Sequence, residues 1–353
     1  MVESALAFTV EFLCSDGCLP RLPGTPGGLA ARQFVEEAFG ELGLEPAGEE
    51  GYLQHIPSIG GANVIGRWRG RSDRNIIVGA HFDACAIDGG VNPGASDNAA
   101  SIAVMLEVGR AIVAGPQLGR SVVFVGFDAE EPPYFQTDRM GSRHFVNEEM
   151  VPLDSIDLMI CLDMIGHLIG NGEESGIADT VFVLGANKSP QVSNVLARVP
   201  DVAGMNPRRL DIDVIDQVSD YAGFQDAGIP FLFYNNGRNE HYHATTDIPE
   251  ILDLTKMAAL VRHLTAVVTL AAGAPLDPFE YQPGGTDHVT TIETIRMLLP
   301  TMPSGTRFTE QAPKLLEMLG EKAASTGLTV GDWQLVRRIF LAIEDGLQDT
   351  RLW

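Results

Sequence analysis

The chain has 353 residues, a hydrophobic content of 45% and a formal net charge of −23. This apolar fraction is ordinary for a globular protein and is sufficient for a buried core. The strong negative charge argues against a nucleic-acid partner, because the phosphates would be repelled. No apolar run reaches the roughly eighteen residues of a membrane span, so we expect no transmembrane helix and no membrane partner.

The N-terminus lacks the basic start and the apolar stretch of a signal peptide. We therefore expect a cytoplasmic protein by default, and an exported one if a leader has been trimmed from the sequence. Cys14 and Cys18 could form a disulfide in an exported protein, although spacing alone cannot establish the bond. Cys85 lies four residues beyond His81, so proximity to a metal is one interpretation. A buried, inert thiol is the favoured one for it and for Cys161.

Helical and strand patterns alternate through the first three quarters of the chain. Apolar residues three or four positions apart predict helices, and short apolar runs predict strands covered on both faces. The expected elements, in chain order, are a helix at 26–43, strands at 63–66 and 75–80, a helix at 98–114, a strand at 121–127, a helix at 141–149, strands at 158–162 and 180–184, a helix from Ser189, a strand at 229–233 and a helix at 253–272. This alternation predicts an α/β fold with a mostly parallel central sheet and helices on both faces.

The composition of the sequence changes after about residue 274, where prolines and glycines form a linker-like stretch. Amphipathic helical patterns follow at 289–299, 309–325 and 329–348. The last pattern has an apolar stripe made by Trp333, Val336, Ile339, Phe340 and Ile343. We therefore predict a main domain over 1–275 and a helical C-terminal extension over 276–353. The extension packs on the main domain or forms a homo-oligomer interface.

Histidine and acidic residues follow three of the predicted strands. His81 and Asp83 come at the end of the strand at 75–80, and the next two strands lead to Glu130-Glu131 and to Asp163. The carboxyl ends of parallel strands meet at one edge of a sheet, where ligands bind in such folds. We expect these side chains to gather at that edge.

Two further groups, Asp97 and His243, complete a metal-binding set with these residues. Apart from Asp83, the set contains two imidazoles and three carboxylates as ligands, and it leaves one carboxylate over. Two zinc ions about 3.5–4 Å apart, sharing one carboxylate, require such a set, and the spare carboxylate can act as the general base. The residues therefore indicate a two-zinc hydrolase, although N and O ligands also accept cobalt or manganese.

Five short segments carry these groups in a recognisable order, and a sixth, Ser219–Phe224, precedes the last core strand: the five are Ala80–Asp83, Pro93–Ser101, Ala129–Glu131, Leu162–Met164 and Tyr242–Asp247. In these segments the chain resembles peptidase family M28, the family of two-zinc aminopeptidases, over roughly residues 20–273. The resemblance implies the zinc-exopeptidase (phosphorylase/hydrolase-like) fold. It also implies two zinc ions and a peptide substrate with a free N-terminus.

The resemblance also implies how the ligands are shared between the ions. His81 and Asp163 would bind one zinc, and Glu131 and His243 would bind the other. Asp97 would bridge the two ions, in a loop where family members often have a cis peptide bond, here Asp97-Asn98. His241 competes with His243 by position, but the Tyr-His-x-x-x-Asp context favours His243.

Other residues are expected to assist the reaction. The resemblance assigns Glu130 as the general base, and Asp83 would hydrogen-bond His81 and fix its tautomer. Asp247 is expected to support the loop that carries His243. Tyr242 could donate a hydrogen bond to the tetrahedral oxyanion, with simple packing against the loop as an equal alternative.

The loop after Glu131 is longer than in the shortest relatives. It places Tyr134 and Phe135 where they could line a substrate pocket, with a proline-pinned surface loop as the competing interpretation. His167, four residues beyond Asp163, is expected at the surface or beside the ligands.

Three alternatives to the aminopeptidase remain open. Glutaminyl cyclases share the architecture and use one zinc, and the full ligand set argues against them without excluding them. A carboxypeptidase or another amidase of the family is a second alternative. A non-catalytic, peptidase-like binding module is the third, and the presence of all six groups disfavours it.

Overall fold

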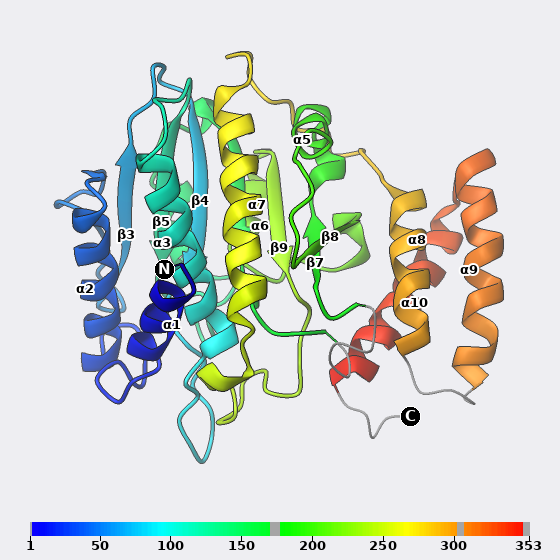
Figure 1. Cartoon of the computed structure of the whole chain (residues 1–353), viewed down its shortest axis with the longest axis horizontal. Helices are drawn as coiled ribbons and strands as arrows, with labels where there is room; N and C mark the ends of the chain where they lie inside the picture. Colours follow the sequence, from blue (N-terminus) through cyan, green and yellow to red (C-terminus); the bar gives the residue numbers. More distant parts are fainter. Residues whose placement is uncertain (1, 170–176, 302–306, 349–353) are drawn as a thin grey trace.

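The computed structural model describes residues 2–169, 177–301 and 307–348. It contains a nine-stranded sheet with helices on both faces (Figure 1). The strands are β1 Glu45–Pro46, β2 Leu53–Ile56, β3 Gly61–Trp68, β4 Asn75–His81, β5 Ser121–Phe127, β6 Ile156–Leu162, β7 Thr180–Leu184, β8 Asn206–Leu210 and β9 Phe231–Asn235. The α-helices are α1 Val2–Leu13, α2 Pro26–Glu41, α3 Ala100–Val113, α4 Gly141–Asn147, α5 Pro190–Leu196, α6 Tyr221–Asp226, α7 Leu254–Gly273, α8 His288–Leu298, α9 Arg307–Ser325 and α10 Val330–Gln348.

The strand order is β1-β3-β5-β4-β6-β9-β7-β8, with β2 paired to β3. The pairings β5-β4, β4-β6 and β6-β9 at the centre are parallel, and β3 and β7 join them in antiparallel register. The predicted α/β sheet with helices on both faces is therefore confirmed, with antiparallel strands toward its edges. Because β4, β5 and β6 run side by side in one direction, their carboxyl ends form a common edge.

Alternate residues of the central strands face two separate cores. On β4, Ile76, Val78 and Ala80 face one core, and Ile77 faces the other. The first core also contains apolar residues of α1, α2, α3, α5 and α7, and the second contains those of α4, α6 and α8 to α10. Both faces of each central strand are therefore buried, which explains the continuous apolar runs in the sequence.

The three C-terminal helices pack beside the β7-β8 end of the sheet (Figure 1). Helix α8 contacts β8, and α9 and α10 contact α8. Of the predicted stripe on α10, Val336, Ile339, Phe340 and Ile343 are buried. Trp333 is half-buried and stacks on His288 with ring centroids 4.4 Å apart. The apolar face of α10 is thus occupied by its own chain, while the predicted domain boundary and homo-oligomer remain predictions.

Helix α7 alone, within the described residues, is long and apolar enough to cross a membrane by length and composition. Most of it is buried in the first core, where it contacts α1, α3 and β4. Its apolar character is therefore accounted for by packing inside the fold.

Candidate metal centre

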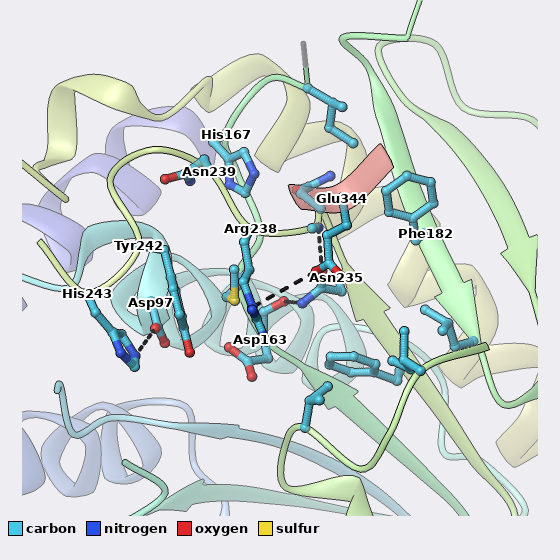
Figure 2. A pocket seen from close by; sticks show the side chains of 18 of the residues that line it. Asp97, Asp163, His167, Phe182, Asn235, Arg238, Asn239, Tyr242, His243 and Glu344 are labelled. Atoms are coloured by element: carbon cyan, nitrogen blue, oxygen red, sulfur yellow. Dashed lines mark hydrogen bonds and ion pairs between the residues drawn. The ribbon is translucent and has the colours of Figure 1, made fainter. Parts of the chain in front are cut away.

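The edge formed by β4, β5 and β6 gathers the side chains that the sequence indicated. His81 is the last residue of β4, Glu130 and Glu131 come three and four residues after β5, and Asp163 follows β6 directly. The other two ligand candidates, Asp97 and His243, arrive at the same edge on loops (Figure 2). Every carboxylate of this set is buried.

The first cluster is made by His81, Asp97 and Asp163, whose donor atoms all lie within 4.8 Å of one another. His81 Nε2 is 3.3 Å from Asp97 Oδ1 and 3.5 Å from Asp163 Oδ1. One nitrogen and two oxygens at such separations match a zinc site with room for water.

The second cluster contains His243 and Glu131, with the Cys85 sulfur inside the same 4.8 Å limit. His243 Nε2 is 3.1 Å from Glu131 Oε2 and 3.3 Å from Asp97 Oδ2. Asp97 therefore presents Oδ1 to one histidine and Oδ2 to the other, which is the geometry of a carboxylate shared by two ions. His241 instead contacts Thr246 through Nδ1 at 3.0 Å, so it does not compete for this cluster.

Glu130 is buried between the clusters, with Oε2 3.8 Å from His81 Nε2. Its position is fixed by Asp83, which accepts hydrogen bonds from the backbone N–H groups of Glu130 and Glu131, both at 3.1 Å. Asp83 Oδ1 also lies 3.3 Å from His81 Nδ1. A single buried carboxylate therefore positions the ligand of one cluster and the backbone of two acidic residues.

Asp247 supports the bridging residue, and not only the loop that carries His243. Its carboxylate accepts hydrogen bonds from the backbone N–H groups of Ser96 and Asp97, at 2.9 and 3.1 Å, and from the Ser96 hydroxyl. The Asp97-Asn98 peptide bond is cis, as the resemblance predicts. The Asn98 amide donates to the carbonyl of Leu162, which ties this loop to the end of β6.

The backbone next to the ligands adopts left-handed conformations that side chains rarely take. Ala129, Met164 and His243 have φ angles of 60°, 51° and 52°. Such residues cost roughly 1–3 kcal/mol each and cluster at functional sites, where the surrounding structure holds them. Here they turn the chain just before Glu130 and just after Asp163.

The donor atoms at this edge fit metal ions better than they fit one another. His81 Nε2, Glu131 Oε1 and Asp163 Oδ1 are buried without a hydrogen-bond partner among the described residues. Within the described ranges, no lysine or arginine forms an ion pair with the four clustered carboxylates. Because a buried carboxylate needs a compensating charge, two divalent cations suit this donor set.

The pKa values record the same excess of negative charge. Burial opposes the charged form of His81, but the carboxylates, led by Glu130, raise its pKa well above the ordinary value. Burial likewise opposes the charged form of His243, and its contacts with Asp97, Cys85 and Glu131 raise its pKa to about 12. Burial raises the pKa of Glu131 to about 7 and that of Glu130 well above its usual range.

A cavity of about 540 Å³ opens from these clusters (Figure 2). Tyr242 lines it and stacks on His243, with ring centroids 3.8 Å apart. Phe135 lines the cavity as the sequence suggested, whereas Tyr134 is half-buried outside its lining. His167 also lines it and is 4% exposed, so the surface alternative for this residue is wrong.

The far wall of the cavity is apolar and comes partly from the C-terminal helices. Phe182 and Glu344 lie on the side away from His243 (Figure 2). Arg238 Nε is 4.0 Å from Glu344 Oε1, and its guanidinium lies 5.3 Å from the Tyr242 ring. Sequence reasoning did not predict this wall, because its only signal is the generic apolar stripe of α10.

The profile of peptidase family M28 matches residues 63–268. The chain belongs to this family. It is 28% identical over 267 residues to the uncharacterized protein YfbL of Escherichia coli (strain K12), covering 67% of this chain and 78% of YfbL. It is 27% identical to the glutaminyl-peptide cyclotransferase of Bos taurus, but that match spans 42% of this chain and about half (49%) of the cyclotransferase.

The fold is shared with solved structures of low sequence identity. The LapA aminopeptidase of Legionella pneumophila superposes with a TM-score of 0.61 at 19% identity, covering 77% of this chain and 71% of LapA. This likeness concerns the fold alone. The functional proposal therefore rests on the M28 match and on the buried set of possible metal ligands.

Proposed function

We propose that this M28 protein is a zinc-dependent aminopeptidase that removes N-terminal residues from peptides. The observation that carries the proposal is Asp97, whose two oxygens face His81 and His243 in separate clusters. Asp163 completes the first cluster and Glu131 the second, so both ions of a two-zinc centre have ligands.

Two zinc ions bound there would polarise the scissile carbonyl and lower the pKa of a water molecule between them. Glu130 accepts the proton of that water as its oxygen attacks the carbonyl carbon. The C–O bond forms, the C–N bond then breaks, and Glu130 passes the proton to the leaving amine. Asp83 holds His81 and the Glu130 backbone in place throughout. Tyr242, which lines the cavity, would donate a hydrogen bond to the oxyanion.

The cavity beside the clusters supports a preference for large apolar N-terminal side chains. Its far wall is formed mainly by apolar residues, among them Leu168, Phe182, Leu184, Leu210, Phe233 and Phe340. Each methylene buried in such a pocket is worth roughly 1–3 kcal/mol. We therefore expect leucyl and phenylalanyl substrates to exceed alanyl substrates by roughly tenfold or more in kcat/KM.

Glutaminyl cyclisation is the second candidate, and the match to the bovine cyclotransferase favours it. In that reaction the substrate's own α-amine attacks its side-chain amide and ammonia leaves. The retained set for two ions supports hydrolysis over cyclisation, because the resemblance assigns one zinc to the cyclases.

The deciding experiment is hydrolysis of a panel of aminoacyl-p-nitroanilides by zinc-loaded protein, with a chelator-treated sample in parallel. The proposal expects chelator-sensitive cleavage, restored by zinc, with the apolar preference above. A glutaminyl peptide assayed for ammonia loss tests the cyclase. Ammonia loss without cleavage of any p-nitroanilide would overturn the aminopeptidase.

Two histidines of one loop provide a matched pair for the metal count. His243→Ala should reduce bound zinc from two to one per chain, because a principal ligand of the second cluster is lost. His241→Ala should keep two, because His241 contacts Thr246 and not the clusters. Equal zinc content in the two variants would contradict the ligand assignment.

A further inference from the structure

Cys85 lies against the second cluster, although sequence reasoning favoured an inert thiol. Its sulfur is within 4.8 Å of the ligand atoms of Glu131 and His243, and its side chain is 9% exposed. Donor atoms around one tetrahedral zinc lie roughly 3.3–3.8 Å apart, given bonds of 2.0–2.3 Å. The three atoms can therefore reach one ion with adjustments of about 1 Å or less.

A second observation at the same place also points to a ligand. Glu131 Oε1 is buried and has no hydrogen-bond partner among the described residues, while Oε2 faces His243 at 3.1 Å. A buried carboxylate oxygen left in this way requires a cation or a donor. The contact of the thiol with the carbonyl of Ala86, at 3.5 Å, is local and weak.

The segment that carries Cys85 is hydrogen-bonded at its ends to a buried arginine that sequence reasoning missed. Arg21 donates to the carbonyls of Phe82, Pro93 and Gly94, so it joins the two ends of the loop. The Arg21 carbonyl in turn accepts from the backbone N–H of Ala84, at 3.0 Å. The backbone directly before Cys85 is thereby tied to the same arginine as the far end of the loop.

We propose that Cys85 is a thiolate ligand of the second metal ion, beside Asp97, Glu131 and His243. This inference rests on the two-zinc centre proposed above. On binding, the S–H bond breaks, the proton passes to solvent and a sulfur–metal bond forms, since a coordinating cysteine binds as thiolate. The chain then has an N,O,O site at His81 and an N,O,O,S site at His243, with Asp97 counted at both.

This difference makes the two sites unequal in metal preference. Thiolate ligands select zinc and other soft ions, whereas carboxylates and imidazole also accept manganese. Zinc added below stoichiometry should therefore occupy the Cys85 site first, and manganese should compete mainly for the His81 site.

The test is the absorption spectrum of cobalt(II)-loaded protein, because a thiolate–cobalt bond adds a charge-transfer band in the near ultraviolet that N and O ligands do not give. Wild type should show the band with two cobalt ions bound. Cys85→Ser should lose it and bind its second ion more weakly, by roughly 10–100-fold or more, since even outer partners of metal ligands control that much. Cys14→Ser is the matched control and should keep the band, because Cys14 Sγ contacts the carbonyl of Pro93 at 3.4 Å.

Reaction of the thiols with a disulfide reagent gives a second readout that does not depend on activity. Zinc should protect one thiol in the wild type and none in Cys85→Ser. Two bound cobalt ions without the band would overturn the thiolate ligand and leave the aminopeptidase proposal standing. Fewer than two bound ions in the wild type would overturn both.

Discussion

The strands β4, β5 and β6 have buried charged side chains at both ends, and the two ends compensate these charges in different ways. At the amino ends, Arg74 precedes β4, Arg120 precedes β5 and Asp157 is the second residue of β6. At the carboxyl ends lie the histidines and carboxylates of the candidate centre. Arg74, Arg120 and Asp157 together form the arginine cluster.

The arginine cluster is satisfied by the protein itself. Asp157 accepts from the guanidinium groups of Arg74 and Arg120 and from the backbone N–H of Phe279. Arg120 is fully buried and also donates to the backbone carbonyls of Ala271, Ala274, Pro275 and Asp277. These bonds fasten the end of α7 and the following segment to the sheet.

The metal centre has the opposite balance, because its carboxylates face histidines and one another. A folded protein retains such an arrangement only where another charge is supplied. Buried charged groups whose hydrogen bonds are all made within the protein, as in the arginine cluster, therefore indicate a structural role. Buried carboxylates with oxygens that lack a partner indicate a binding site. Mutations at the two ends should accordingly separate stability from activity.

The largest effect is expected from Glu130→Gln. Loss of the proposed general base should lower kcat by roughly 10²–10⁴-fold on the best substrate, with the zinc content unchanged. The metal-free variant should be at least as stable as the wild type, because one of four crowded carboxylates becomes neutral. Urea unfolding and zinc content measure the two outcomes, and a marked loss of stability would contradict the comparison.

At the other end, Arg120→Met should lower the free energy of unfolding by about 3–5 kcal/mol, because it leaves Asp157 buried with less compensation. The kcat per zinc-loaded molecule should stay unchanged. Arg69→Met removes the exposed ion pair with Glu45, whose nearest atoms are 2.9 Å apart. It should leave the free energy of unfolding nearly unchanged, because solvent screens an exposed pair. Equal losses in the free energy of unfolding for the two variants would show that burial does not decide the strength of these ion pairs.

A buried histidine away from both ends provides a test by pH. His263 of α7 pairs with the Tyr234 hydroxyl at 3.1 Å, and burial lowers its pKa to about 4. In the unfolded chain the histidine pKa is near 6.5. Between about pH 4 and pH 6.5 the histidine is therefore protonated in the unfolded chain and neutral in the folded protein. Stability is therefore complete above about pH 6.5 and falls toward pH 4, by about 1.4 kcal/mol per pH unit.

The measurement is urea unfolding of metal-free wild type and His263→Gln at pH 6.5 and 5. The wild type should lose about 2 kcal/mol more than the variant over this interval. Protonation of the metal ligands affects both proteins equally, so the difference isolates His263. Parallel losses would mean that this histidine is charged in the folded protein.

The sequence predicted the central strands and the gathering of candidate ligands at their ends, because both signals are local. Apolar runs mark β4, β5 and β6, and His81, Glu131 and Asp163 follow within a few residues. Asp97 and His243 come from segments distant in the sequence, and only the family resemblance assigned which ion each of them binds. The π-turn at Ala95–Ala99 also delays the start of α3, which begins at Ala100 and not at 98.

The elements that the sequence did not predict depend on long-range packing. Strand β8, Asn206–Leu210, contains a proline and two arginines and lies at the sheet edge, where an alternating apolar pattern is unnecessary. Helix α1 and the short α6 were also missed. The side chains of α10 reach the cavity only because α8 places that helix beside β7 and β8, a relation that no local pattern records.

The smallest effect on activity is expected at Asp247. Its carboxylate lies beside the candidate metal centre but accepts hydrogen bonds from the protein itself. It accepts from Ser96 and from the backbone of Asp97, so Asp247→Asn turns one acceptor into a donor facing those N–H groups. Zinc affinity should fall by about 10–100-fold, the effect typical of groups that orient a ligand, and metal-free stability by about 1–3 kcal/mol.

Asp253→Ala is the matched control for this prediction. Asp253 caps α7 by accepting from the backbone N–H of Lys256 at 2.8 Å, so the variant should lose about 1 kcal/mol of stability and keep its zinc affinity. Calorimetric zinc titration compares the two variants. Asp247→Asn could instead lose stability and keep wild-type zinc affinity. The hydrogen-bonded carboxylate of Asp247 would then have a structural role, like Asp157 in the arginine cluster. The orphaned carboxylates alone would then account for metal binding.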